Sequence, residues 1–224
     1  MSSVIPQALA FHFEFPVRHL KTVPKKGPRL LDLSEEFRLP WPGATLGASE
    51  IESPIDLRLA WNTNGLGISY VVSGKQQRPV TAHPERPAEG DGLQIWIDTR
   101  NTQTIHRANR FCHQFCLLPV GDSKSGARPR VHQLPIARAA EDAPQHDPDR
   151  FRIWSEVTSR GYALEAWLPA DVLNGFDVEV CSQLGFSCVL RDAELGEHSL
   201  TVGTEFPVAT DPSLWQTLDL RSGE

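Results

Sequence analysis

The stretch "GDGLQIWIDTRN", residues 90–101, decides the fold prediction because its side chains alternate between two kinds. One side of the alternation carries Leu93, Ile95 and Ile97. A two-residue period of this kind is typical of a β-strand that buries one face. The other side carries Gln94, Trp96 and Asp98. A tryptophan on the polar side of a strand raises the question of what its ring contacts.

The same alternation recurs at short intervals along the chain. Strands are predicted in "ALAFHFEFPV" (8–17), "IDLRLAWN" (55–62), "LGISYVVS" (66–73), "RFCHQFCLLP" (110–119), "GYALEAWLP" (161–169), "LGFSCVLRD" (184–192) and "WQTLDL" (215–220). The turn at residues 62–65 closes a hairpin, and residues 169–176 predict one short helical turn near Asp171. Many short strands predict an all-β, antiparallel, jelly-roll-like sandwich with long loops and little helix.

Two polar segments predict long loops inside the fold rather than a linker between domains. Residues 119–130 are rich in Gly, Ser and Pro, and residues 137–150 are polar and interrupted by proline. Neither segment separates two comparable halves. We therefore expect a single domain over residues 1–224, with its core at about 8–220.

Composition excludes several classes of protein. The chain has 224 residues, a formal net charge of −6 and 40% hydrophobic residues, which suffices for a core. The negative charge argues against a general nucleic-acid binder. No apolar run approaches the ~20 residues of a membrane span. The first residues lack a charged start followed by an apolar block, which predicts a cytoplasmic location.

The four cysteines, Cys112, Cys116, Cys181 and Cys188, are too few for a disulfide scaffold. We expect buried, reduced thiols, although pairing of Cys112 or Cys116 with Cys188 stays open. A metal site with His113 is disfavoured. On a regular strand Cys112 and Cys116 lie about 13 Å apart and His113 points the other way.

Strand parity predicts a face able to bind a ligand. If the central strands share one sheet, its non-core side carries Trp96, Trp167, Gln94, Gln114, Glu165, Arg110 and Arg191. The two rings would pack on the C–H face of a sugar, and the polar groups would bind its hydroxyls. Two alternatives remain. The rings belong to a second apolar cluster beneath covering loops, or they form a contact with a protein partner.

The segment "DTRNTQTIHRANRFCH", residues 98–113, concentrates cationic side chains in an acidic protein. It carries Arg100, His106, Arg107 and Arg110. Clustered arginines bind carboxylates or phosphates well, and an acidic sugar is compatible with them. The alternative is a solvated turn whose charges pair with nearby carboxylates.

Four pieces of the chain resemble family-nine carbohydrate-binding modules and the wider DOMON-like group of β-sandwiches. They are "LRLAWNTNGLGISYVVS" (57–73), "GDGLQIWIDTRN", "GYALEAWLPADVL" (161–173), and "LGFSCVLRDAE" followed by "DPSLWQTLDL" (184–220). The resemblance implies a non-catalytic sandwich that binds sugars and is often attached to polysaccharide hydrolases. It also allows structural calcium, with Asp91, Asp98 and Asp192 as candidate ligands.

The two tryptophans between which modules of this family hold a sugar ring are not present in this chain. They align with Ala88 and Ala209, and a hydroxyl-binding carboxylate of the family aligns with Gln94. The family arginine aligns near Cys112, with Arg110 two residues away. The resemblance therefore implies the scaffold, while the ligand contacts must come from other residues.

The predicted function is a non-catalytic carbohydrate-binding domain that stacks sugar on Trp96 and Trp167, with no cofactor. The alternative is a protein-interaction or structural domain on the same scaffold. An enzyme is disfavoured because no G-x-S-x-G motif occurs, although Glu156 and Glu165 would form a glycosidase pair if close in space. Haem ligation by Met and His is excluded because Met1 is the sole methionine, which leaves only histidine pairs among His106, His113 and His132.

Overall fold

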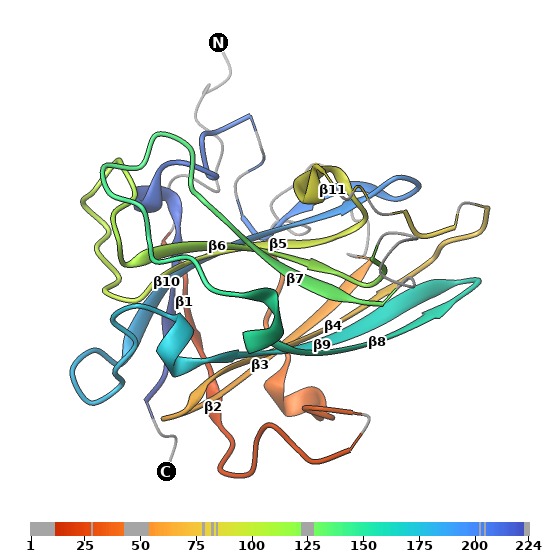
Figure 1. The fold of residues 1–224 in the computed structure, drawn as a ribbon, viewed down its shortest axis with the longest axis horizontal. Helices are drawn as coiled ribbons and strands as arrows, with labels where there is room; N and C mark the ends of the chain where they lie inside the picture. The colour runs from red at the N-terminus through yellow and green to blue at the C-terminus, as the bar shows by residue number, and fades with distance from the viewer. Residues whose placement is uncertain are drawn as a thin grey trace.

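The computed structural model describes residues 12–27, 29–42, 54–77, 79–81, 83, 85–121, 128–201, 203 and 205–221. The predicted core boundary at residue 8 and residues 122–127 of the first predicted loop lie outside these ranges. Within them, two β-sheets form the two layers of a sandwich, which Figure 1 shows. The predicted all-β sandwich is confirmed.

In the described residues, one sheet has seven strands. Its order is β1 (Glu14–Pro16), β12 (Gln216–Asp219), β10 (Gln183–Asp192), β5 (Gly92–Asp98), β6 (Cys112–Leu118) and β7 (Arg130–Leu134), and β11 (Gly196–Ser199) also pairs with β10. The other sheet has five strands in the order β2 (Arg18–His19), β3 (Ile55–Asn62), β4 (Gly65–Ser73), β9 (Gly161–Pro169) and β8 (Arg152–Thr158).

Most strand pairs are antiparallel, as predicted, but both sheets are mixed. The short strands β1 and β2 pair in parallel with β12 and β3, respectively. The named helical elements are 3₁₀ turns of three residues: η2 (Glu35–Phe37), η3 (Pro87–Glu89), η5 (Pro148–Arg150), η6 (Ala170–Val172) and η7 (Pro212–Leu214). The turn η6 is the helical turn predicted near Asp171. Over the described ranges, no helix has both the length and the apolar character needed to cross a membrane.

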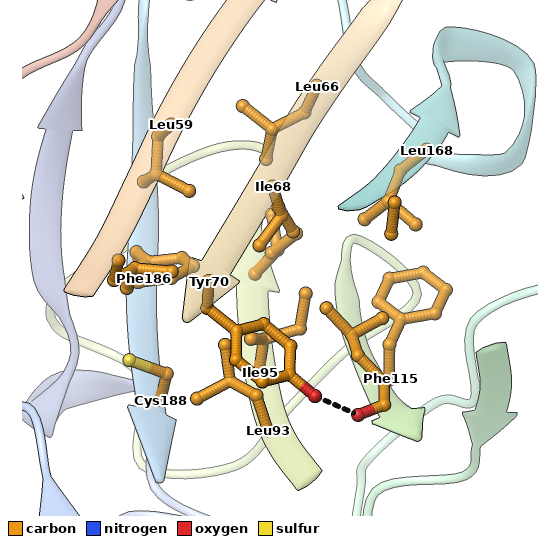
Figure 2. Packing of buried hydrophobic residues seen from close by; sticks show 14 of the residues in the cluster. Leu59, Leu66, Ile68, Tyr70, Leu93, Ile95, Phe115, Leu168, Phe186 and Cys188 are labelled. Carbon is orange, nitrogen blue, oxygen red and sulfur yellow. Dashed lines mark hydrogen bonds between the residues drawn. The ribbon is translucent and has the colours of Figure 1, made fainter. Parts of the chain in front are cut away.

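The main core lies between the inner faces of the two sheets. Leu93, Ile95 and Ile97 of β5 are fully buried there, as their alternation predicts. Tyr70 of β4 reaches across to β6, where its hydroxyl donates a hydrogen bond to the Leu117 carbonyl at 2.8 Å (Figure 2). Burial of an aliphatic side chain such as Ile95 stabilises the fold by about 1.5–3 kcal/mol.

The cysteines are free thiols, and Cys112, Cys116 and Cys188 are buried. Cys181 is half-buried, and its thiol donates to the Gln183 carbonyl at 3.1 Å. Burial raises the pKa of the Cys112 and Cys116 thiols to about 12. The thiols therefore behave as small apolar side chains, and the prediction of reduced cysteines is confirmed.

His113 lies on the inner side of β6, where water does not reach its ring. The side chain is 1% exposed and stacks on Phe115 with 6.0 Å between ring centroids. Its Nδ1 atom has no partner within the described residues, and Nε2 lies 3.5 Å from the Asn174 carbonyl oxygen. Burial lowers the pKa of His113 from 6.5 to about 4.

Replacing His113 with leucine should make the protein less sensitive to acid. Between pH 6.5 and 4 the unfolded chain binds a proton that the folded chain cannot accept, so stability falls as the pH falls. In the native protein, this loss in the free energy of unfolding should reach about 3 kcal/mol near pH 4, and the His113→Leu protein should lack it. Urea unfolding at pH 7 and pH 4.5 measures it in both proteins.

The comparison of the two proteins isolates His113 from other groups that titrate. Burial raises the pKa of Asp98, which works in the opposite direction because the folded state then binds a proton more readily. Parallel pH profiles for the native and His113→Leu proteins would contradict the assignment.

Candidate functional site

The predicted parity of the central strands is correct, but the predicted common face is not. Gln94, Trp96, Gln114 and Arg191 do lie on the outer side of the seven-stranded sheet. Glu165 and Trp167 lie on β9, in the five-stranded sheet. The outer faces of the two sheets point away from each other. The pleat fixes which side chains share a face of one strand, but it does not assign strands to sheets.

Trp96 is 2% exposed. Three loop segments cover it, at residues 105–108, 136–139 and 206–215. Its ring belongs to a second apolar cluster with Ala108, Cys112, Ile136, Val189, Val208 and Trp215. Two of the covering segments are joined to each other, because the Arg107 guanidinium donates to the carbonyls of Arg138 and Ala139 at 2.9 and 3.2 Å. The prediction that Trp96 is exposed is therefore wrong, and the covered alternative is correct.

Trp167 is buried on the opposite outer face and is 3% exposed. A segment of the chain before β3 covers it, in a third cluster with Val23, Leu30, Leu31, Leu33 and Ala60. The covering segment supplies apolar contacts that a sugar would otherwise make. Trp167 is therefore a core residue of this face rather than a ligand contact.

Glu165 fixes that covering segment in place. Its carboxylate is 1% exposed and accepts hydrogen bonds from the backbone N–H groups of residues 30, 31 and 32 at 2.7, 3.0 and 3.2 Å. The Arg29 guanidinium donates two more, from Nε at 2.8 Å and Nη2 at 2.6 Å, and lies over the Trp154 ring. With five donors Glu165 has no free oxygen for a sugar hydroxyl, and it cannot act as a catalytic partner of the exposed Glu156.

The other predicted contact residues are engaged within the protein. The Gln94 amide donates to the Ala88 carbonyl at 2.9 Å, and Arg191 pairs with Glu197 of β11 at 2.6 Å. Gln114 is buried beside Trp96. Arg110 is exposed and lies 3.7 Å from Glu141.

The cationic residues of 98–113 gather only in part: Arg100 and Arg110 lie over the same Phe111 ring, whereas His106 and Arg107 contact other loops. His106 is exposed, and its Nδ1 lies 3.1 Å from both Asp211 Oδ2 and Ser213 Oγ. A Ser-His-Asp triad uses two different ring nitrogens, so this contact is not a catalytic relay. Haem ligation by a histidine pair is likewise unsupported, because His113 faces the core while His132 pairs across from Cys116 on the outer side.

Arg100 alone of that group lines a polar depression on the outer face of the seven-stranded sheet. The depression has a volume of about 580 Å³ and is open to solvent. It lies beside β1 and β12, where Glu14 sits opposite Thr217 and Thr217 opposite Gly185. The lining residues are His12, Glu14, Arg100, Asn101, Thr102, Gln103, Thr104, Gln183 and Thr217. We call it the β12 depression.

Gly185 lies opposite Thr217 on β10, and a side chain there would crowd Asp98. A Cβ atom at this position would lie 3.1 Å from Asp98 Cβ, which is a tight contact, and 3.6 Å from Asn101 Oδ1, which is an ordinary van der Waals distance.

Thr217 is the centre of a hydrogen-bond network in the β12 depression. Its hydroxyl oxygen accepts from Gln103 Nε2 at 2.6 Å and from Asn101 Nδ2 at 3.2 Å, and lies 3.3 Å from His12 Nε2. Burial lowers the pKa of His12, so its ring is neutral near pH 7 and can both donate and accept. Amides, hydroxyl and neutral imidazole suit a polyhydroxylated ligand, which itself donates and accepts at each oxygen.

A buried carboxylate holds the loop that carries Arg100, Asn101 and Gln103. Asp98 accepts from the backbone N–H groups of Arg100 at 2.9 Å and Thr102 at 2.6 Å. Asn101 has φ +48°, the left-handed conformation that asparagine tolerates better than most residues. The Arg100 guanidinium lies over the Phe111 ring at 4.9 Å. The loop is therefore tied down at its backbone while its side chains face the depression.

Two of the three candidate calcium ligands, Asp91 and Asp192, are paired with a lysine, while the third, Asp98, accepts backbone N–H groups of its own loop. The Lys75 ammonium lies 2.7 Å from both carboxylate oxygens of Asp192 and 3.9 Å from Asp91, and all three side chains are buried. Burial alone would raise the pKa of Asp192, but Lys75 and backbone N–H groups hold it below its ordinary value. A metal ion at these two carboxylates would have to displace a buried ammonium that already contacts Asp192. No cluster of three or more metal-binding side chains occurs within the described ranges.

Solved structures with the same fold include carbohydrate-binding modules. A family 9 module from Caldicellulosiruptor kristjanssonii in complex with cellotriose is 13% identical, with a TM-score of 0.64 over 95% of both chains. Its complex with glucose is 12% identical, with a TM-score of 0.64 over 95% of this chain and 97% of that one. No protein-family model and no curated protein matches. The family-nine-like fold is confirmed, and the DOMON-like grouping stays a prediction.

Replacing Glu165 with glutamine should loosen the segment over Trp167. The amide would bring an N–H group toward donors that now face an oxygen, leaving buried groups unsatisfied. Urea unfolding should show a loss of about 2–4 kcal/mol, and the amides of residues 30–32 should exchange faster with deuterium. Glu156→Gln, on the exposed neighbouring strand, should change stability by less than ~0.5 kcal/mol. Equal effects of both variants would show that Glu165 does not hold the segment.

Proposed function

We propose that this sandwich is a non-catalytic carbohydrate-binding domain and that the sugar binds in the β12 depression. The observation that carries the proposal is the network of neutral groups around Thr217, in an open depression of about 580 Å³. That volume lies within the ~300–1,000 Å³ typical of small-molecule sites. The shared fold with modules solved in complex with cellotriose and glucose supports the same ligand class.

The depression replaces the predicted tryptophan face as the place of binding. Trp96 and Trp167 are covered on opposite faces, so neither can stack on a sugar in this structure. Among the described residues, those that line the β12 depression include no aromatic side chain other than His12. Affinity must then come mainly from hydrogen bonds, each of which replaces a bond to water. A neutral monosaccharide should therefore bind with a Kd on the order of 1 mM.

Titration with methyl glucoside or cellotriose, followed by amide NMR, tests the proposal. Shift changes should centre on residues 100–104, 183 and 217. Gln103→Ala should weaken binding about fivefold, because it removes about one neutral hydrogen bond of ~1 kcal/mol. Thr217→Val should also weaken binding, because it releases the Asn101 and Gln103 amides that the Thr217 hydroxyl positions. Fitting the shift changes against sugar concentration gives the Kd of each protein.

Gln145→Ala serves as the matched control. Gln145 is an exposed amide in the loop that follows β7, at the opposite edge of the same sheet. This variant should bind the sugar as the native protein does. Shift changes that cluster around Gln94 and Arg191 would place the ligand elsewhere on the sheet. No change at 50-fold the expected Kd, that is about 50 mM sugar, would reject sugar binding and favour an interaction domain.

A further inference from the structure

Arg100 carries a positive charge into the β12 depression with no direct carboxylate contact in the described residues, although the buried Asp98 carboxylate attracts it from beneath the loop. Over the described ranges it forms no ion pair within 4 Å, although it is half-buried. Its guanidinium lies over the face of Phe111 at 4.9 Å. A cation–π contact engages the flat face of a guanidinium and leaves the N–H groups at its edge available. Arg100 can therefore offer a forked donor to an anion.

The negative groups near the depression are already engaged. Glu14, which also lines it, pairs with Arg221 at 3.1 Å and accepts from Gln183 at 3.3 Å. Asp98 lies beneath the loop, where its oxygens accept backbone N–H groups. Asp219 is paired with Arg221. These contacts reduce the negative charge that would oppose an anionic ligand at Arg100.

A second guanidinium adds to the positive charge around the Phe111 ring. Arg110 lies over the same ring at 5.1 Å, and its nearest carboxylate, Glu141, is exposed and 3.7 Å away. An exposed pair of this length is weak and is screened by salt. Arg100 and Arg110 thus form a local positive patch in a chain of net charge −6.

We propose that the β12 depression prefers an acidic sugar, a hexuronate, whose carboxylate pairs with Arg100 while its hydroxyls bind the amides of Asn101 and Gln103, which the buried Thr217 hydroxyl holds in place. This inference rests on the proposed function and adds the ligand's charge to it. A guanidinium fork matches both oxygens of a carboxylate. The neutral amides of Asn101 and Gln103 lie beside Arg100 in the same depression. A hexuronate, which carries one carboxylate and several hydroxyls on one sugar ring, requires this arrangement.

Three probes separate the parts of the proposal: methyl glucuronoside, methyl glucoside and acetate. The two glycosides differ only at C6, so the ratio of their Kd values measures the contribution of the carboxylate. The glucuronoside should bind about fivefold to tenfold more tightly at 20 mM salt. The ratio should shrink at 500 mM salt, because screening weakens a half-exposed ion pair. Acetate, which lacks hydroxyls, should bind more weakly than the glucuronoside.

Variants with opposite expected effects assign the preference to this site. In Arg100→Gln the ratio should fall to about one. In Glu14→Gln it should rise about twofold, because a like charge is removed. Arg160→Gln makes the same charge change as Arg100→Gln, but in the turn between β8 and β9 of the other sheet, and should leave the ratio unchanged. Thermal unfolding of each variant confirms that it folds.

The outcomes distinguish this inference from the proposed function. Equal binding of both glycosides at the depression overturns the preference for an acidic sugar and leaves carbohydrate binding standing. Acetate binding as tightly as the glucuronoside indicates a simple anion site and also overturns it. A preference that survives in Arg100→Gln contradicts the role of Arg100. Failure of both glycosides to bind rejects the proposed function itself.

Discussion

Both sheets of this sandwich bury part of their outer faces as well as their inner ones, and this constraint shapes the rest of the molecule. An antiparallel sheet commonly leaves its outer face to water. Here Trp96 and Trp167 create apolar surface on opposite outer faces, and separate segments of the chain cover each. The Glu165 carboxylate anchors one cover through backbone N–H groups, and Arg107 joins two segments of the other. The surface left for a ligand is the part of the sheet that neither cover reaches.

The alternation of side chains predicts the strands and their buried sides well, because a strand in a sandwich core has little freedom in its pattern. Leu93, Ile95 and Ile97 are buried as predicted, and Gln94 and Trp96 point outward. The same pattern cannot say which strands share a sheet. Strands β5 and β9 have the same alternation of apolar and polar side chains, each with a tryptophan on the polar side, but they belong to different sheets. The prediction that Trp96 and Trp167 share one face was wrong for that reason.

The β12 depression could be predicted only in part. The cationic segment 98–113 drew attention to Arg100, and parity alone would place Thr217 and Glu14 on outer faces. What joins them is the parallel pairing of β1 with β12, which connects residues about 200 positions apart in the chain. No local pattern in the sequence encodes such a pairing.

Lys75 has a consequence for the conditions under which this fold can exist. A metal ion held by two aspartates exchanges with solution, so the structure around it depends on the ambient supply of that ion. An ammonium on the chain itself cannot diffuse away from Asp91 and Asp192. This end of the sandwich therefore keeps a fixed positive charge beside its two carboxylates in dilute buffer and in the presence of chelators, whatever the concentration of divalent cations.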